Sequence, residues 1–184
     1  HKGFKFEPGQ FAWLTAWTSP FADSEHPFSF SSSSESELLG FTIKELGSFT
    51  QSIKHLEIGQ VVYVDGPYGS FSIDRHPFAK GFLFIAGGIG ITPMMSMIRS
   101  MRDRKDTRPV QLIYASKDVD SLTFVDELQD LKICLDLKVT YVIENPPPNW
   151  EGEKGYISRE LLKNSIPVQY IPNSFEIFIC GPEP

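Results

Sequence analysis

The chain has 184 residues and a formal net charge of −6 at pH 7, with 41% hydrophobic and 22% charged residues. These values are ordinary for a globular protein, and the acidic balance argues against a nucleic-acid-binding protein, which normally carries a basic stripe. The length allows one large domain or two modest ones. The two cysteines, Cys134 and Cys180, are far apart and match neither a disulfide framework nor a metal-binding motif. We therefore expect a reducing compartment, no disulfide partner and no bound metal.

The N-terminal part, residues 4–74, is predicted to be mainly β-structure. Short segments rich in aromatic and β-branched residues are separated by turn residues, which predicts strands at 10–17, 26–32, 38–46 and 60–66. One short helix is predicted between the last two strands, at residues 47–56. Several short strands with one helix favour a small β-barrel.

From Gly81 onward, strand-like segments alternate with helix-like ones. Strands are predicted at 81–86, 109–115, 137–143 and 175–180, and helices at 93–104, 123–135 and 158–164. Residues 145–155 contain three prolines and two glycines and therefore predict a loop. The alternation predicts a doubly wound (Rossmann-like) parallel sheet, so we expect a β-barrel followed by an α/β domain, with the boundary within residues 71–81.

The segment FIAGGIGITPMM, residues 84–95, raises three possibilities: a nucleotide-binding turn, a structural turn or part of a membrane span. A span needs about 20 apolar residues, and the nearly charge-free stretch 82–98 is shorter and interrupted by glycines and Pro93. Glycines between a strand and a helix let backbone amides approach a pyrophosphate. However, Pro93 replaces the third glycine of the dinucleotide fingerprint, and Ser116 and Lys117 stand where its acidic residue would be. The segment alone leaves the nucleotide-binding and structural turns open.

Three further groups of residues have a functional and an ordinary interpretation. Phe28 beside Ser29 could stack on a flat ring and donate a hydrogen bond, or could belong to a plain barrel strand. Lys44 near a helix start suits a second phosphate site, or the helix is simply capped. CGPEP puts Cys180 and Gly181 at the end of a strand, where a ligand of the sheet would lie, or Cys180 is a buried inert thiol.

Taken in order, the motifs PGQF, HPFS, IKxLGxFT, GPYG, GGIGITP and CGPEP resemble those of the ferredoxin–NADP reductase superfamily over residues 8–184. HPFS together with GxFT is most similar to the ferric reductase and NADPH oxidase branch. His26 and Phe28 stand where the more usual motif has arginine and tyrosine. The resemblance implies an FAD-binding barrel at residues 1–75 and an NAD(P)H-binding domain at residues 76–184. We expect one or more N-terminal strands of the barrel and the C-terminal helix of the second domain to be missing from this segment.

The resemblance also implies a role for particular residues. The residues expected to bind FAD are His26, Pro27, Phe28, Ser29, Lys44, Gly47, Phe49 and Thr50. Tyr68 of GPYG is also expected to belong to the cofactor-binding site. Those expected to bind NAD(P)H are Gly87, Gly88, Gly90, Thr92, Pro93, Ser116, Lys117, Cys180, Gly181 and Pro182. In the implied reaction, hydride passes from NAD(P)H to flavin N5 and electrons leave singly. Ser29 would tune N5, while Thr92 and Cys180 would orient the nicotinamide.

The electron acceptor is expected outside this segment, because the chain has no cysteine cluster and its four histidines, His1, His26, His55 and His76, lack a pairing suited to haem. The resemblance implies a haem-bearing membrane domain, with this segment on the cytoplasmic side and ferric iron or oxygen as the final acceptor. Two alternatives are a soluble flavin or ferredoxin-type reductase and a nucleotide-binding regulatory module without redox turnover. Lys117, in place of an acidic residue, favours NADPH over NADH through attraction of a 2′-phosphate.

Overall fold

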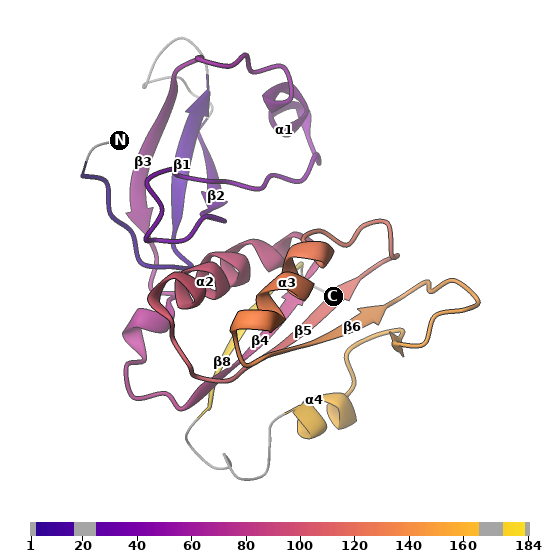
Figure 1. The fold of residues 1–184 in the computed structure, drawn as a ribbon. Coiled ribbons are helices and arrows are strands. Elements are labelled where there is room, and N and C mark those ends of the chain that lie inside the picture. The colour runs from indigo at the N-terminus through magenta and orange to yellow at the C-terminus, as the bar shows by residue number, and fades with distance from the viewer. Residues whose placement is uncertain (1–2, 17–24, 166–174, 183–184) are drawn as a thin grey trace.

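Two sheets organise the protein in the computed structural model, which describes residues 3–16, 25–165 and 175–182. A small antiparallel sheet lies in the N-terminal part, and a parallel sheet with helices follows it (Figure 1). The predicted fold class is confirmed. Residue 17, the last of the first predicted strand, lies outside the described residues.

The antiparallel sheet has the order β2-β1-β3 within the described residues. Its strands are β1 (Phe11–Ala16), β2 (His26–Ser29) and β3 (Val62–Tyr68), and the short helix α1 (Ser48–Ile53) precedes β3. The sheet packs against a small core that contains Phe6, Ala12 and Phe30. Among the described residues, β2 pairs only with β1 and is an edge strand.

The predicted strand at 38–46 is wrong. The segment makes one isolated bridge, from Phe41 to Phe30, and otherwise runs as irregular chain. The Gly40 carbonyl accepts hydrogen bonds from the amides of Ser31 and Ser32, at 2.7 and 3.3 Å, so it is not available to a regular ladder. Leu38 is 75% exposed, which shows that the apolar residues of this segment do not all face a core.

The parallel sheet has the order β7-β6-β5-β4-β8. Its strands are β4 (Gly81–Gly87), β5 (Val110–Ser116), β6 (Leu137–Ile143), β7 (Glu153–Lys154) and β8 (Phe175–Cys180). The helices α2 (Ile91–Arg104) and α3 (Val125–Cys134) cover one face, and α4 (Arg159–Ser165) covers the other (Figure 1). Short 3₁₀ turns, Ile73–Arg75 and Gly88–Gly90, precede β4 and α2.

Two details of this part differ from the predictions. The loop predicted at 145–155 contains β7, whose two residues pair with Val142 and Ile143. A two-residue strand is too short for hydrophobic periodicity to reveal. The helix predicted from Pro93 begins at Ile91, and Pro93 still lies in the first turn, where its missing N–H has no intrahelical acceptor to lose.

The buried core lies between the sheet and α2. Phe82 and Phe84 point from β4 toward α2 and are fully buried, and the methionines of α2 cover them. Leu83 and Ile85 alternate to the other face, toward α4. This two-sided burial holds the carboxyl end of β4 in a defined place. Within the described part of the chain, no helix is both long and apolar enough to cross a bilayer.

Candidate cofactor-binding site

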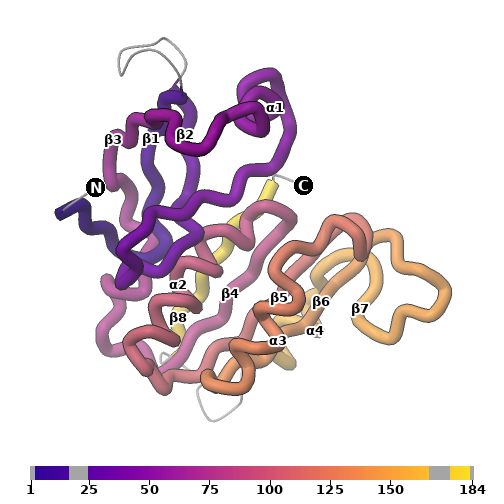
Figure 2. The backbone as a smooth tube through the Cα atoms, turned by 45° about the horizontal axis from the view of Figure 1, so that its top comes forward, coloured from indigo at the N-terminus to yellow at the C-terminus, as the bar shows by residue number. Residues whose placement is uncertain are grey.

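The carboxyl ends of β4 and β8 form the switch point of the parallel sheet. From β4 the chain builds the sheet outward through β5, β6 and β7, and it then returns to β8 on the opposite side of β4. In open α/β sheets, ligands bind in the crevice at such a reversal. Figures 1 and 2 show the carboxyl end of β8 on the side of the parallel sheet that faces α1.

The two glycine-containing motifs meet at this point. A Cβ atom on Gly90 would lie 2.1 Å from the Cys180 carbonyl oxygen, which no side chain could tolerate. A Cβ atom on Gly181 would lie 3.1 Å from Gly87 Cα, and one on Gly87 would lie 3.2 Å from Pro182 Cδ. GGIGITP and CGPEP are therefore packed backbone against backbone, and five of the predicted nucleotide-binding residues come together here.

Gly88 differs from its neighbours because its surroundings are open. Its φ is 51°, in the left-handed region, and a Cβ atom there would meet nothing within 4 Å. Space beside the backbone at the start of a helix is what an approaching diphosphate needs. Thr92 is 3% exposed, and its hydroxyl donates a 2.8 Å hydrogen bond to the Ile89 carbonyl, so it also braces the turn.

Cys180 ends β8 and packs beside the main core. Burial raises the pKa of its thiol above the ordinary value. The group is therefore neutral at physiological pH and a weak nucleophile. This environment suits a side chain that contacts a ligand rather than one that forms a covalent bond with it.

Strand β2 and helix α1 bring the predicted FAD-binding residues together. The His26 and Phe49 rings stack with centroids 3.8 Å apart, and Phe28 lies 6.1 Å from Phe49 with its ring tilted by only 16°. Pro27, between His26 and Phe28 in the chain, is exposed, and Ser29 is partly buried at the end of the strand. The result is a partly exposed aromatic surface on an edge strand.

The side chain of Thr50, in the first turn of α1, caps the start of this helix. The Thr50 hydroxyl accepts hydrogen bonds from the amides of Leu46 and Gly47, at 2.8 and 2.9 Å, and donates one to the Gly47 carbonyl at 3.0 Å. The ordinary interpretation of this segment as a capped helix thus has direct support. Lys44, two residues before Leu46, is exposed.

Lys44 lies on the same side of the molecule as the segment that follows β5, close enough to affect one carboxyl there. The pKa of the Asp118 carboxyl is lowered mainly by hydrogen bonds from Ser121, and further by the positive charges of Lys117 and Lys44. Lys44 therefore lies within electrostatic range of the segment that follows β5. Ser116 at the end of β5 is buried, whereas Lys117 is exposed.

Tyr68 lies at the same end of the antiparallel sheet as Ser29. Phe11 of β1 pairs with Ser29 on one side and with Tyr68 on the other, so the three residues form one row across the sheet. The Tyr68 hydroxyl donates a 3.0 Å hydrogen bond to Asp65, which raises the pKa of the phenol. Of the predicted catalytic residues, Ser29 lies in the antiparallel sheet, whereas Thr92 lies in α2 and Cys180 in β8, so they are divided between the two parts.

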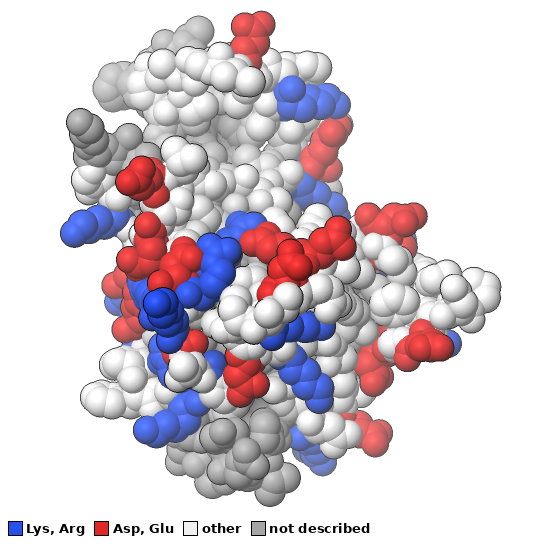
Figure 3. Space-filling model, in the orientation of Figure 1, with Lys and Arg blue, Asp and Glu red and all other residues white. Residues whose placement is uncertain are grey.

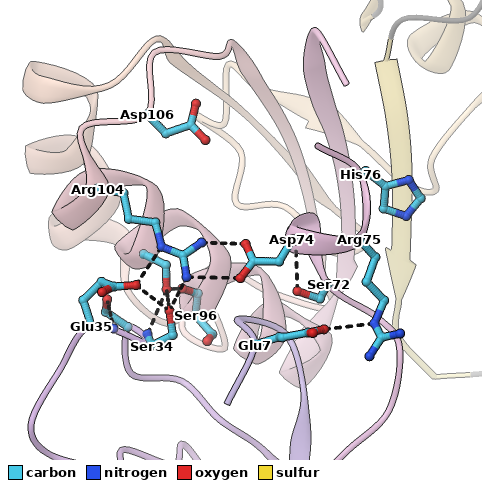
Figure 4. A network of polar contacts seen from close by, with 12 residues as sticks. Glu7, Ser34, Glu35, Ser72, Asp74, Arg75, His76, Ser96, Arg104 and Asp106 are labelled. Carbon is cyan, nitrogen blue, oxygen red and sulfur yellow. Dashed lines mark hydrogen bonds and ion pairs between the residues drawn. The ribbon is translucent and has the colours of Figure 1, made fainter. Parts of the chain in front are cut away.

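A polar junction between the two parts was not predicted from the sequence. Residues 31–35 follow β2 after one intervening residue. They contact serine side chains along one side of α2 and the arginine at its C-terminal end (Figure 4). Figure 3 shows charged residues of both signs interspersed over α2 and α3, in contrast to the largely uncharged face of the antiparallel part. Two features of the sequence could have pointed to this junction. One is the polar residues that recur at helical spacing in an otherwise apolar helix, and the other is the run of four consecutive serines at 31–34.

Replacing Gly90 by alanine tests the backbone contact at the switch point. We expect G90A to lower the free energy of unfolding by at least about 2 kcal/mol, because the added methyl group forces β4 and β8 apart. The comparison variant G88A should cost about 1 kcal/mol, since only its left-handed backbone is unfavourable. Urea denaturation measures both values, and equal losses in the two variants would show that the contact is not restrictive.

Thiol reactivity tests the environment of Cys180. Because burial raises its pKa, a smaller fraction is thiolate at a given pH, and iodoacetamide at pH 8 should alkylate Cys180 more slowly than a free peptide thiol. Its rate should still increase with pH where the rate of the peptide thiol has already levelled off. C134S removes the exposed second cysteine, and mass spectrometry follows the remaining one. Modification at the rate of the peptide thiol would contradict the structure.

The chain matches two families of cofactor-binding domains. Residues 84–184 match the oxidoreductase NAD-binding domain family, and residues 1–72 match an FAD-binding domain family. NADH-cytochrome b5 reductase 1 of Ajellomyces capsulatus is 35% identical over 145 residues, which cover 75% of this chain and 46% of that protein. The chain thus spans about half the length of the curated relatives it matches.

Solved structures agree with this assignment. The CS-b5R domains of human Ncb5or in the NAD⁺ form are 27% identical with a TM-score of 0.79, covering 97% of this chain and 54% of that one. A Neisseria gonorrhoeae ferredoxin NADP⁺ reductase with bound FAD and NADP has the same fold, with 23% identity, a TM-score of 0.77 and coverage of 98% and 76%. The predicted cofactors, FAD and a nicotinamide dinucleotide, are confirmed. The chain belongs to the oxidoreductase NAD-binding domain family, within the ferredoxin–NADP reductase superfamily.

Proposed function

We propose that the chain is the dehydrogenase part of an oxidoreductase that uses FAD to carry electrons from NAD(P)H to a one-electron acceptor outside this segment. The observation that carries the proposal is the contact between Gly90 and the Cys180 carbonyl at the switch point. That contact holds a turn with an open position, Gly88, at the crevice where this class of sheet binds its ligand. The proposal divides the chain into an FAD-binding unit, residues 1–75, and an NAD(P)H-binding unit, residues 76–184.

The turn after β4 fits a dinucleotide. Gly88 leaves room for a diphosphate between the packed Gly87 and Gly90, and the first amides of α2 would donate to it, with Thr92 and Pro93 forming the first turn. Cys180, Gly181 and Pro182 would flank the nicotinamide. Ser116 and Lys117 would lie at the adenosine ribose, at the end of the neighbouring strand β5.

The β2 and α1 surface fits FAD. His26 and Phe28, grouped around Phe49, offer flat rings on an exposed edge strand. Ser29 would donate a hydrogen bond to the flavin, with Pro27 and Tyr68 beside it. The exposed Lys44 would supply charge for the pyrophosphate. Gly47 and Thr50 would present the backbone of α1 to the same group.

The residues of this site act by position. When bound, FAD accepts a hydride from NAD(P)H at N5 and can release two electrons one at a time. Thr92 is buried and braced by the Ile89 carbonyl, and Cys180 carries a neutral thiol, so both can contact a nicotinamide without exchanging a proton with it. Holding two rings in contact replaces a bimolecular encounter by an intramolecular step, which is a large part of catalysis.

For the acceptor we propose a haem protein of the cytochrome type. The relatives with 31–35% identity are named NADH-cytochrome b5 reductases or cytochrome b5 reductase 4, and the name is the support for this choice. The second candidate is a ferric reductase or NADPH oxidase arrangement, in which a haem-bearing membrane domain receives the electrons on the cytoplasmic side. The observation that favours it is His26 in HPFS, whose ring stacks on Phe49 of GSFT.

Flavin reduction tests the proposed function. After FAD is added to the protein, anaerobic titration with NADH or NADPH should bleach the visible absorbance of the bound flavin with about one equivalent of nucleotide, because each hydride carries two electrons. Dithionite, which needs no nucleotide site, provides the control for a reducible flavin. If dithionite bleaches the bound flavin and both nucleotides leave it oxidised, the chain is a nucleotide-binding module without redox turnover.

Lys117 tests the choice of nucleotide. We propose NADPH on the basis of its charge, although Asp118 beside it would oppose a 2′-phosphate and the relatives are named for NADH. K117E should raise KM for NADPH at least about tenfold, equivalent to about 1.4 kcal/mol, and change KM for NADH less than about twofold. D118N should lower KM for NADPH. Equal effects of K117E on both nucleotides would remove Lys117 from the ribose site.

A further inference from the structure

Two fully buried serines of α2 hold the backbone of the segment that follows β2. The Ser96 hydroxyl donates to the Ser32 carbonyl at 2.8 Å. The Ser100 hydroxyl accepts from the Ser34 amide at 2.9 Å and donates to the Ser96 carbonyl at 2.8 Å. A buried hydroxyl in a helix is unfavourable unless it is hydrogen-bonded, and alanine would suit the helix better. These serines are therefore explained by the contact with residues 31–34.

Arg99 completes the same helix face at the i, i+3, i+4 spacing. Its Nη1 donates to the Ser31 carbonyl at 2.5 Å, while Nε and Nη2 form a bidentate pair with Glu127 of α3 at 2.7 and 2.6 Å. The guanidinium lies 5.0 Å from the centre of the Phe124 ring. Arg99 is only 19% exposed, so these contacts are largely shielded from solvent. One side chain thus joins the antiparallel part, α2 and the start of α3.

Arg104 secures the far end of the same segment. It contacts Glu35 at 2.7 Å, the Ser34 hydroxyl at 2.8 Å and Asp74 at 2.5 Å (Figure 4). These groups are more exposed than Arg99, so each contact contributes less on its own. Together with Arg99 and the serines, they hold residues 31–35 against α2 along about two turns of the helix.

The held segment begins two residues after Ser29, and the holding helix begins at the nucleotide turn. Ser31 follows Ser29 by about 7 Å of extended chain. Ser96 follows Thr92 by about 6 Å along the helix axis. The two side chains proposed to face the flavin and the nicotinamide are therefore connected by a short path of covalent bonds and buried hydrogen bonds through Ser96 and Arg99.

We propose that Arg99, supported by Ser96 and Ser100, is a positioning residue that sets the flavin strand β2 against the nicotinamide turn. The inference rests on the proposed function. Arg99 contacts none of the residues proposed to bind the flavin or the nicotinamide. It acts through the Ser31 carbonyl on one side and through α2 on the other. Loss of this connection leaves both cofactor sites in place and lets their relative position vary. Misplacement of reacting groups by about 1 Å can slow a reaction roughly 100-fold.

Arg108 offers a matched control. It has the same three kinds of partner as Arg99: a carboxylate, Asp106, a backbone carbonyl, that of His76, and a phenylalanine ring, Phe82, 4.7 Å away. None of these partners belongs to residues 31–35. R108M therefore removes a comparable set of contacts from the NAD(P)H-binding part without releasing the segment after β2.

The experiment compares FAD-loaded wild type, R99M, R108M and the double variant S96A/S100A. Anaerobic rapid mixing with saturating NADH or NADPH measures the rate constant of flavin reduction, and amide hydrogen exchange followed by mass spectrometry measures protection of residues 30–36. The FAD dissociation constant and the thermal midpoint are measured alongside. The double variant keeps the test valid if R99M fails to fold, because it removes two hydroxyls without exposing a charge.

We expect R99M to reduce flavin roughly 10- to 100-fold more slowly and to exchange the amides of residues 30–36 faster, with its FAD dissociation constant within about threefold of wild type. S96A/S100A should change in the same direction. R108M should lower the thermal midpoint yet reduce flavin within about threefold of the wild-type rate. The inference would be overturned if R99M and S96A/S100A reduced flavin at the wild-type rate. It would also be overturned if R108M slowed flavin reduction as much as R99M does. If neither nucleotide reduces the FAD bound to the wild-type protein, the proposed function itself is overturned.

Discussion

Gly90 lies against the carbonyl of Cys180 so closely that only a hydrogen atom fits between the backbones. This contact sets the path of the chain between β4 and α2, because any side chain at position 90 would separate β4 from β8. The open position Gly88 comes two residues before Gly90, and α2 begins directly after Gly90 at Ile91. The turn that we propose to bind the nucleotide is therefore fixed by packing within the sheet.

Helix α2 meets two demands on opposite faces. One face buries Met94, Met97, Ile98 and Met101 against the parallel sheet. The other holds residues 31–35 through buried serines and through Arg99, whose charge is balanced by Glu127. A buried charge without its partner is costly, so Arg99 and Glu127 depend on each other. Because α2 is a rigid body between the sheet and the segment after β2, it transmits the position of one cofactor site to the other.

Much of the architecture is predictable from local patterns. The strands 137–143 and 175–180 have the predicted bounds, because each is a short run rich in apolar and β-branched residues. The pattern fails at residues 38–46, where Phe41 makes only an isolated bridge, and at β7, which is too short to have a period. The order of the motifs leads to the superfamily, while the roles of individual residues such as Ser29 and Thr50 stay predictions. Thr50 shows why, since its hydroxyl already caps α1.

The sequence by itself determined the two-part fold, the two cofactors and the turn at residues 87–93, because these depend on short motifs whose residues are close in the chain. The tertiary structure decided which of those glycines packs and which is open, since Gly90 meets Cys180 from a strand 90 residues away, whereas Gly88 meets nothing. It also decided the junction of Ser96, Arg99 and Ser100 with residues 31–34. Hydrogen bonds to backbone carbonyls and amides impose no side-chain pattern on the partner segment, so only their geometry in the folded chain reveals them.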